Sequence, residues 1–209
     1  YKPYFFMKIK KTNNLKLFLI LITSLFAIII FLSIPVLYNY KSLENRIEKQ
    51  FFSEFNIELE ILGEISRQNF PRPHLTIEKA NLKLKSNNSE TQNLLVKKLK
   101  ISIPYRNFFS KSKFEMMSTE ITGSNIKFKY SDIKKFREHL YYKINKPVII
   151  KNSKFFYLDK NNETILISPI ENLEYFINKK SNSKELKIIG NIFNIDFNSI
   201  WIRKYDNPH

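Results

Sequence analysis

The stretch VKKLKISIPY, residues 96–105, decides the fold of this chain. Apolar residues stand at every second position, with polar residues, mostly lysine, between them: Leu99, Ile101, Ile103 and Tyr105 against Lys98, Lys100 and Ser102. A period of two is typical of a β-strand, because successive side chains point to opposite faces. We therefore expect a strand here with one apolar side and one wet, basic side.

The same alternation recurs through most of the chain. It runs through residues 55–61, 75–77, 80–85, 126–130, 148–150, 155–158, 164–167, 173–177 and 186–202. A slip in the alternation at Glu78 and Lys79 indicates a turn or a bulge. About ten strands of this kind predict a mainly β fold, an antiparallel sheet with one solvated face.

Two segments follow a helical period instead. Residues 41–55 carry apolar side chains four positions apart, which predicts a short amphipathic helix with Ser42 as its N-cap. Residues 131–144 show a second stripe of this kind, with Ser131 as a candidate cap. Two short helices are too few to cover so large a sheet. We therefore expect the antiparallel sheet to curl into a groove or an open taco.

An uncharged stretch of 21 residues, LFLILITSLFAIIIFLSIPVL, occupies positions 17–37. A helix of this length crosses a hydrocarbon core of about 30 Å. Lysines and no acidic residues precede it, which places the N-terminus in the cytoplasm. The sequence thus predicts a basic cytoplasmic tail (1–16), a transmembrane anchor (17–37) and a β-rich domain on the far side (38–209). A cleaved signal peptide is the alternative, but no small-residue cleavage site follows the stretch.

The chain of 209 residues has 35 Lys and Arg against 19 Asp and Glu, a formal net charge of +16. Such an excess is typical of nucleic-acid binding. However, Lys2, Lys8, Lys10, Lys11 and Lys16 precede the apolar stretch, where they orient it, and the other lysines alternate with apolar residues along the strands. We expect no nucleic-acid partner. A binder of nucleic acid or of another anionic surface through the lysine-rich faces is the weaker alternative.

Catalytic chemistry is poorly represented. The chain has no cysteine, three glycines and three histidines that lie far apart. It therefore lacks thiolate metal sites and the glycine loops that bind phosphate. We predict no enzyme activity, no catalytic residue, no cofactor and no metal ligand, although carboxylates brought together only by folding stay possible.

Residues 63–65 (GEI) and 70–82 (FPRPHLTIEKANL) resemble the N-terminal region of the AsmA family of bacterial envelope proteins. The positions that carry this motif are Gly63, Pro71, Pro73, Leu75, Ile77, Ala80 and Leu82. Residues 149–159 and 186–197 are similar to later strands of the family, although Asn152 and Ser153 stand where the family often has glycine. Family members are usually several times longer, so we expect the chain to be truncated at its C-terminus.

The resemblance implies an inner-membrane anchor, a periplasmic β-rich domain and a relation to bridge-like lipid-transfer proteins. It implies a role in outer-membrane biogenesis and lipid homeostasis, in which an apolar groove carries phospholipid acyl chains. The candidate groove residues are Phe55, Ile57, Leu59, Ile61, Leu99, Ile101, Ile103, Phe128 and Tyr130. Ordinary core packing explains each of them equally well. The alternative function is a structural module that binds envelope proteins and affects outer-membrane protein assembly without moving lipid.

Overall fold

The computed structural model describes residues 12–33, 43–68, 71–85, 91–107, 115–129 and 144–204. The chain divides into two compact units, residues 1–38 and 39–209. The candidate caps Ser42 and Ser131, the groove candidate Tyr130 and residues 131–143 of the predicted second helix lie outside the described residues.

The first unit contains one helix, α1 (Thr12–Ser33), of 22 residues. Two of its hydroxyl groups bond within the helix: Thr23 and Ser33 donate to the carbonyls of Leu19 and Ile29 at 2.8 Å. Side chains 15–30 are exposed. The predicted anchor continues to residue 37, past the described end of α1. In the described ranges, no helix reaches both the length and the apolarity that crossing a membrane requires.

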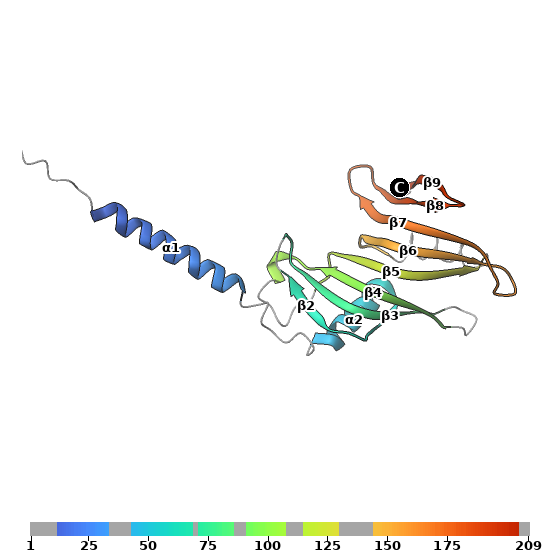
Figure 1. Ribbon diagram of the computed structural model, residues 1–209, viewed down its shortest axis with the longest axis horizontal. Helices are drawn as coiled ribbons and strands as arrows, with labels where there is room; N and C mark the ends of the chain where they lie inside the picture. Colours follow the sequence, from blue (N-terminus) through green and yellow to red (C-terminus); the bar gives the residue numbers. More distant parts are fainter. Residues whose placement is uncertain are drawn as a thin grey trace, which may run out of the picture. The chain divides into compact units, whose positions relative to one another are not determined.

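The second unit is a single sheet whose two outermost strands do not pair with each other, so it is not closed into a barrel (Figure 1). Its strands are β1 (Glu58–Ile61), β2 (Ile65–Gln68), β3 (His74–Lys85), β4 (Thr91–Ser102), β5 (Ser118–Lys129), β6 (Val148–Leu158), β7 (Thr164–Asn178), β8 (Ser183–Ile192) and β9 (Ile195–Lys204). They lie in the order β1-β3-β4-β5-β6-β7-β8-β9, and β2 pairs with β3 beside β1. A short 3-10 helix, η3 (Tyr105–Asn107), follows β4. The prediction of a mainly β fold is confirmed.

The sheet is not antiparallel throughout, which corrects the prediction. β5 and β6 run parallel, with Thr119 beside Val148 and Ile126 beside Phe155. Parallel neighbours need a long connection that returns the chain to the starting end of the sheet. Residues 130–147 provide that connection.

Several predicted strand boundaries are wrong. Residues 148–150 and 155–158 belong to one strand, β6, and residues 164–167 and 173–177 belong to β7. Conversely, residues 186–202 contain two strands, β8 and β9, joined by a two-residue turn. Phe193 and Asn194 at this turn have φ of 51° and 63°, and two positive φ values define the tight hairpin turn of type I′.

A row of irregular residues that crosses neighbouring strands explains why the sequence pattern divides β6 and β7 into two predicted strands each. The pairing places Lys79, Lys97, Gly123, Asn152 and Glu171 side by side across β3 to β7. Three of them have positive φ: 70°, 69° and 46° for residues 79, 123 and 152. At this bulge row, two consecutive residues of each strand leave the buried face, so the alternation slips while the strand continues. The alternation slips at residues 78 and 79 as predicted, within a continuous strand rather than at a turn, and the register between β3 and β4 is the same on both sides.

Gly63 interrupts the edge strand formed by β1 and β2. The backbone there lies against β3: Leu62 N–H donates to Lys79 O at 3.1 Å, and Glu78 N–H donates to Glu64 O at 3.1 Å. A Cβ atom on Gly63 would lie 1.4 Å from the carbonyl oxygen of Glu78. Only glycine permits this approach, so this motif residue has a structural role.

Helix α2 (Glu44–Phe55) covers part of the apolar face of the sheet (Figure 1). Its buried stripe is Ile47, Phe51 and Phe55, as the four-residue spacing predicts. The N-cap is Leu43 rather than Ser42, and it makes no side-chain capping bond. The stripe joins a core cluster that includes apolar residues of β1 and β3 to β8.

Candidate functional site

The predicted groove residues come together, but in a packed core. Phe55, Leu59, Ile61, Leu99, Ile101 and Ile103 are buried, whereas Ile57 and Phe128 are half-buried and pack against the same cluster. They come from α2, from β1, β4 and β5, and from the segments beside these strands. Because α2 covers this part of the sheet, these residues do not form an open surface.

The motif residues line β3 and the loop before it. Leu75 and Ile77 precede the bulge at Lys79, and Ala80 and Leu82 follow it, yet all four side chains are buried. The bulge shifts the alternation by one, which keeps both halves of the strand facing the core.

The two prolines of the motif hold the end of β4. Pro73 O accepts the backbone N–H of Ile103 at 2.9 Å, and Pro71 O accepts the hydroxyl of Tyr105 at 2.9 Å. Tyr105, expected on the apolar face, lies in η3 and is exposed. The strand predicted over residues 96–105 therefore ends earlier, at Ser102.

The apolar face becomes open at the strand farthest from α2. Tyr175, Leu186 and Trp201 occupy one row of β7, β8 and β9, and their exposed fractions are 1%, 3% and 48%. On the same side of β9, Ile195 is 70% exposed and Phe197 is half-buried. We define Ile195, Phe197 and Trp201 as the open apolar edge.

Phe197 connects this edge to the core. It pairs with Gly190 of β8, and a Cβ atom there would lie 3.1 Å from the Phe197 ring and 2.7 Å from the carbonyl oxygen of Pro169. Glycine at position 190 therefore lets the Phe197 ring lie close against β8. The apolar surface is continuous from the core to the open apolar edge.

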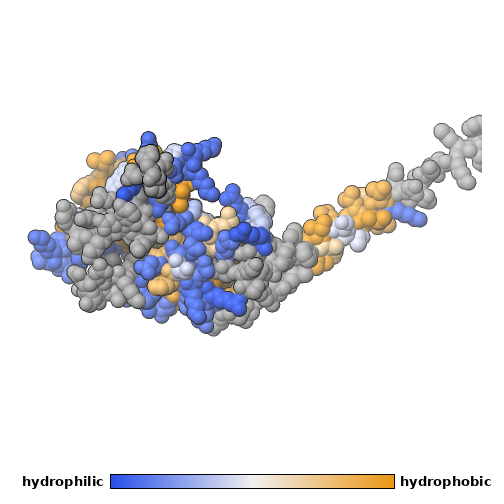
Figure 2. Space-filling view, turned by 180° about the vertical axis from the view of Figure 1, so that it is seen from behind, coloured by the Kyte–Doolittle hydropathy of each residue, from blue (hydrophilic) through white to orange (hydrophobic). Residues whose placement is uncertain are grey.

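The opposite side of β9 also carries exposed apolar residues. Ile200 and Ile202 are 54% and 61% exposed and pair with Lys187 and Glu185 of β8, and Ile189, 38% exposed, lies diagonally opposite Ile200. Figure 2 shows hydrophobic side chains gathered on parts of the sheet unit, among hydrophilic ones. Exposed apolar clusters of this kind mark interaction surfaces on soluble domains.

The sequence analysis missed the open apolar edge because it treated residues 186–202 as one strand. The missed signal is a phase shift at residues 193–194. Before it the core-facing positions are even-numbered (Leu186, Ile188), and after it they are odd-numbered (Phe197, Trp201).

A buried polar contact lies beside this edge. Lys184 Nζ donates to the carbonyl of Ile144 at 3.1 Å and to Asn145 Oδ1 at 3.3 Å, and Tyr175 donates its hydroxyl to the same Ile144 carbonyl at 3.0 Å. Burial, and then the positive charge of Arg203, lowers the pKa of Lys184. These contacts hold the end of the β5–β6 connection on the sheet.

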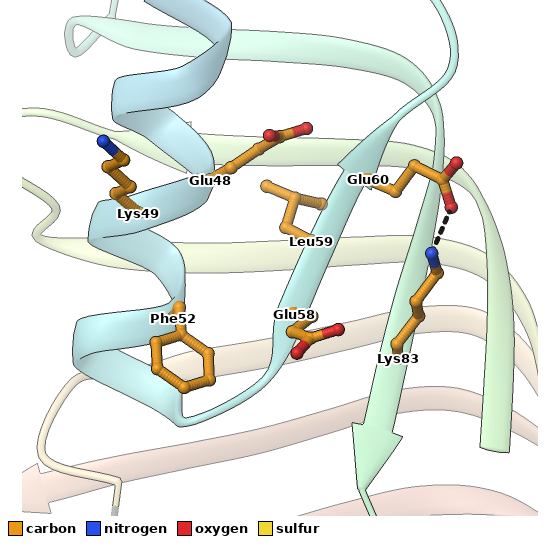
Figure 3. Close-up of a pocket in the computed structure, with 7 residues that line it drawn as sticks. All are labelled: Glu48, Lys49, Phe52, Glu58, Leu59, Glu60 and Lys83. Carbon is orange, nitrogen blue, oxygen red and sulfur yellow. Dashed lines mark ion pairs between the residues drawn. The ribbon is translucent and has the colours of Figure 1, made fainter. Parts of the chain in front are cut away.

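A shallow pocket of about 470 Å³ lies between α2 and β1 (Figure 3). Its lining comprises Glu48, Lys49, Phe52, Glu58, Leu59, Glu60 and Lys83. Glu60 and Lys83 form an ion pair of 3.0 Å, and the hydrogen bond from Lys83 lowers the pKa of Glu60. Glu48 Oε1 accepts the backbone N–H of Ile61 at 3.2 Å, which ties α2 to the edge strand. These polar residues of the pocket lining therefore hold α2, β1 and β3 together, which accounts for their presence without a ligand.

Potential metal ligands do not gather in the part of the chain that the structure describes. No three His, Cys, Asp or Glu side chains there could hold one metal ion. His74 is buried, and its ring nitrogens contact Arg72 O at 2.8 Å and Gln68 Oε1 at 3.1 Å.

No family model, curated protein or solved structure matches this chain. The resemblance to the AsmA family therefore stays a prediction from the sequence.

Proposed function

We propose that this chain is a membrane-anchored, non-enzymatic envelope protein whose open apolar edge receives phospholipid acyl chains. The observation that carries the proposal is the change in exposure along one row of the sheet, from 3% at Leu186 to 48% at Trp201. In this proposal the sheet curls around the apolar face and leaves a groove that opens at β9.

The chemistry of the edge suits an acyl chain. Ile195, Phe197 and Trp201 supply aliphatic and aromatic surface, and Arg203 follows on the same side of β9. Each buried methylene of a lipid tail contributes about 0.8 kcal/mol. A few contacted methylenes are enough for transient capture, which is what a carrier needs.

The anchor and the location belong to the same proposal. The apolar residues of α1 and the lysines before it support a single span with the N-terminus in the cytoplasm. The sheet unit then lies on the periplasmic side of the inner membrane. There it supports outer-membrane biogenesis and lipid homeostasis, as the sequence resemblance implies.

Binding of an envelope protein is the second candidate function. Ile200 and Ile202 on the opposite side of β9 favour it, because a protein partner can cover an apolar surface that is not a groove. The two candidates therefore use opposite faces of one strand.

Site-specific photocrosslinking distinguishes them. The full chain is produced in bacterial membranes with p-benzoylphenylalanine in place of either Trp201 or Ile200. These neighbours on β9 are similarly exposed, 48% and 54%, but lie on opposite faces. After irradiation, mass spectrometry identifies the adducts.

Phospholipid adducts at position 201 and not at position 200 are the expected result. Equal lipid adducts at both positions would indicate general contact with a bilayer and contradict a groove. Protein adducts at position 200 without lipid at position 201 would favour the interaction module.

A further inference from the structure

The face of the sheet opposite the core is strongly basic over four strands. The lysines at outward positions of β3 to β6 are Lys79, Lys83, Lys97, Lys98, Lys100, Lys127, Lys129, Lys151 and Lys154. Glu78 and Glu120 are the only carboxylates at the outward positions described in these strands, and they pair with Lys98 and Lys151 at 3.1 Å. We call this surface the lysine face.

The fold concentrates these charges. At the bulge row, two consecutive residues of each strand point away from the core, so both Lys97 and Lys98 are exposed, and Lys79 is exposed beside Glu78. A regular strand would send one residue of each such pair inward. Neighbouring strands lie about 4.8 Å apart, so the lysines of four strands form one continuous patch.

The lysine face ends at acidic flanks. Outward positions on β1 are Glu58 and Glu60, and those on β7 include Glu171 and Glu174. On this face of the sheet, the lysine-rich strands β3–β6 therefore lie between β1 and β7, which carry glutamates and no lysine.

We propose that the lysine face docks on the anionic phospholipid headgroups of a bilayer surface. The choice of a bilayer rests on the proposed membrane anchor, which holds the sheet unit at such a surface. Clusters of lysines next to a membrane bind anionic headgroups through charge, without shape-specific contacts.

The residue types favour a bilayer over a nucleic acid. All basic residues of the face are lysines, which act as point charges, and the planar guanidinium groups that nucleic-acid sites commonly add are absent from its described positions. Phe156 is the sole aromatic residue among the outward positions described in these four strands. Bases would find little to stack on.

The test uses the full chain, which has no natural cysteine. A spin label is attached to Asn125→Cys, an exposed position within the lysine face. The chain is reconstituted into vesicles of phosphatidylcholine with or without 30% phosphatidylglycerol, about one anionic lipid in three. The anionic lipid gives the vesicle surface a strong negative potential. A water-soluble relaxation agent reports how accessible the label is. Flotation with neutral vesicles measures membrane attachment through the anchor, independently of the accessibility of the label.

Two matched variants carry the same change of charge. One reverses four lysines of the face, Lys97→Glu, Lys98→Glu, Lys127→Glu and Lys154→Glu. The control reverses four exposed lysines elsewhere, Lys160→Glu, Lys179→Glu, Lys180→Glu and Lys204→Glu.

In anionic vesicles, the accessibility of the label is expected to fall several-fold, and 1 M salt, where the Debye length is about 3 Å, is expected to restore it. The face variant is expected to lose this protection, and the control variant is expected to keep it.

Equal accessibility in neutral and anionic vesicles, or equal loss in both variants, would overturn the proposal. Protection by a single-stranded oligonucleotide but not by anionic vesicles would also overturn it. If the chain fails to float with neutral vesicles, the anchor is wrong, whereas salt-sensitive protection by anionic vesicles would still support the lysine face.

Discussion

At the residue scale, the most unusual group is Lys184, a lysine on the buried face of β8. Its ammonium replaces lost hydration with the Ile144 carbonyl and the Asn145 amide oxygen. Tyr175 donates to the same carbonyl, so that acceptor keeps a partner when the lysine is absent. Taking the ammonium out of water costs free energy, and these hydrogen bonds offset part of that cost.

Replacing this lysine should change how stability depends on pH. Burial lowers the pKa of Lys184 in the folded chain, so between that pKa and the ordinary lysine pKa of about 10.4 the unfolded chain binds more protons. The free energy of unfolding of the wild type therefore rises with pH in this range. Lys184→Met removes this pH dependence. The free energy of unfolding of the wild type should therefore rise relative to that of the variant between pH 7 and pH 9.5 (a range below the ordinary lysine pKa).

Denaturant unfolding at the two pH values measures the difference. Lys180→Met, at an exposed turn position, is the control and should follow the wild type. Parallel pH profiles for wild type and Lys184→Met would show that burial of the ammonium has no energetic consequence.

At the element scale, α2 packs on the sheet through one stripe of apolar side chains. The Phe51 and Phe55 rings contact each other, with centroids 4.7 Å apart, and both are 2% exposed. Phe52, the next residue after Phe51, is 44% exposed. The helix therefore offers two adjacent phenylalanines in opposite environments.

Phe51→Ala should destabilise the sheet unit by about 3–5 kcal/mol, because it leaves a cavity between α2 and the sheet. Phe52→Ala should cost less than about 1 kcal/mol, because it removes a partly solvated ring. Urea unfolding of the full chain in mild detergent, followed by the circular dichroism of the sheet, compares the variants. Similar losses for both would mean that α2 does not pack by this stripe.

At the scale of the whole molecule, one sheet passes from a covered centre to an open edge. Core-facing residues of β4 such as Val96, Leu99 and Ile101 are fully buried, whereas Ile195 and Trp201 of β9 are exposed. Among the described strands, β9 pairs with β8 alone. Its amides are therefore protected by few buried contacts.

Native-state hydrogen exchange should follow this gradient. Amides of β9 that pair with β8 should exchange through local opening, with a free energy well below that of β4. Mass spectrometry of peptides from the full chain measures both strands in one experiment. Equal protection of β4 and β9 would show that the sheet opens as one cooperative unit.

The sequence by itself determined which segments are strands with one apolar face, and which residues of α2 are buried. It could do so because side-chain direction follows from local backbone geometry: a period of two in strands, and of about 3.6 in helices. The same reasoning brought Phe55, Leu99 and Ile101 to one face before their contacts were known.

Only the tertiary structure decided the parallel pairing of β5 with β6, the continuity of β6 and β7 through the bulge row, and the hairpin at residues 193–194. Each depends on hydrogen bonds between backbone segments, which the order of side chains does not encode. It also decided which apolar residues stay exposed. Leu186 and Trp201 both lie on an apolar strand face, but Leu186 is buried between described strands, whereas Trp201, on the outermost described strand β9, is 48% exposed.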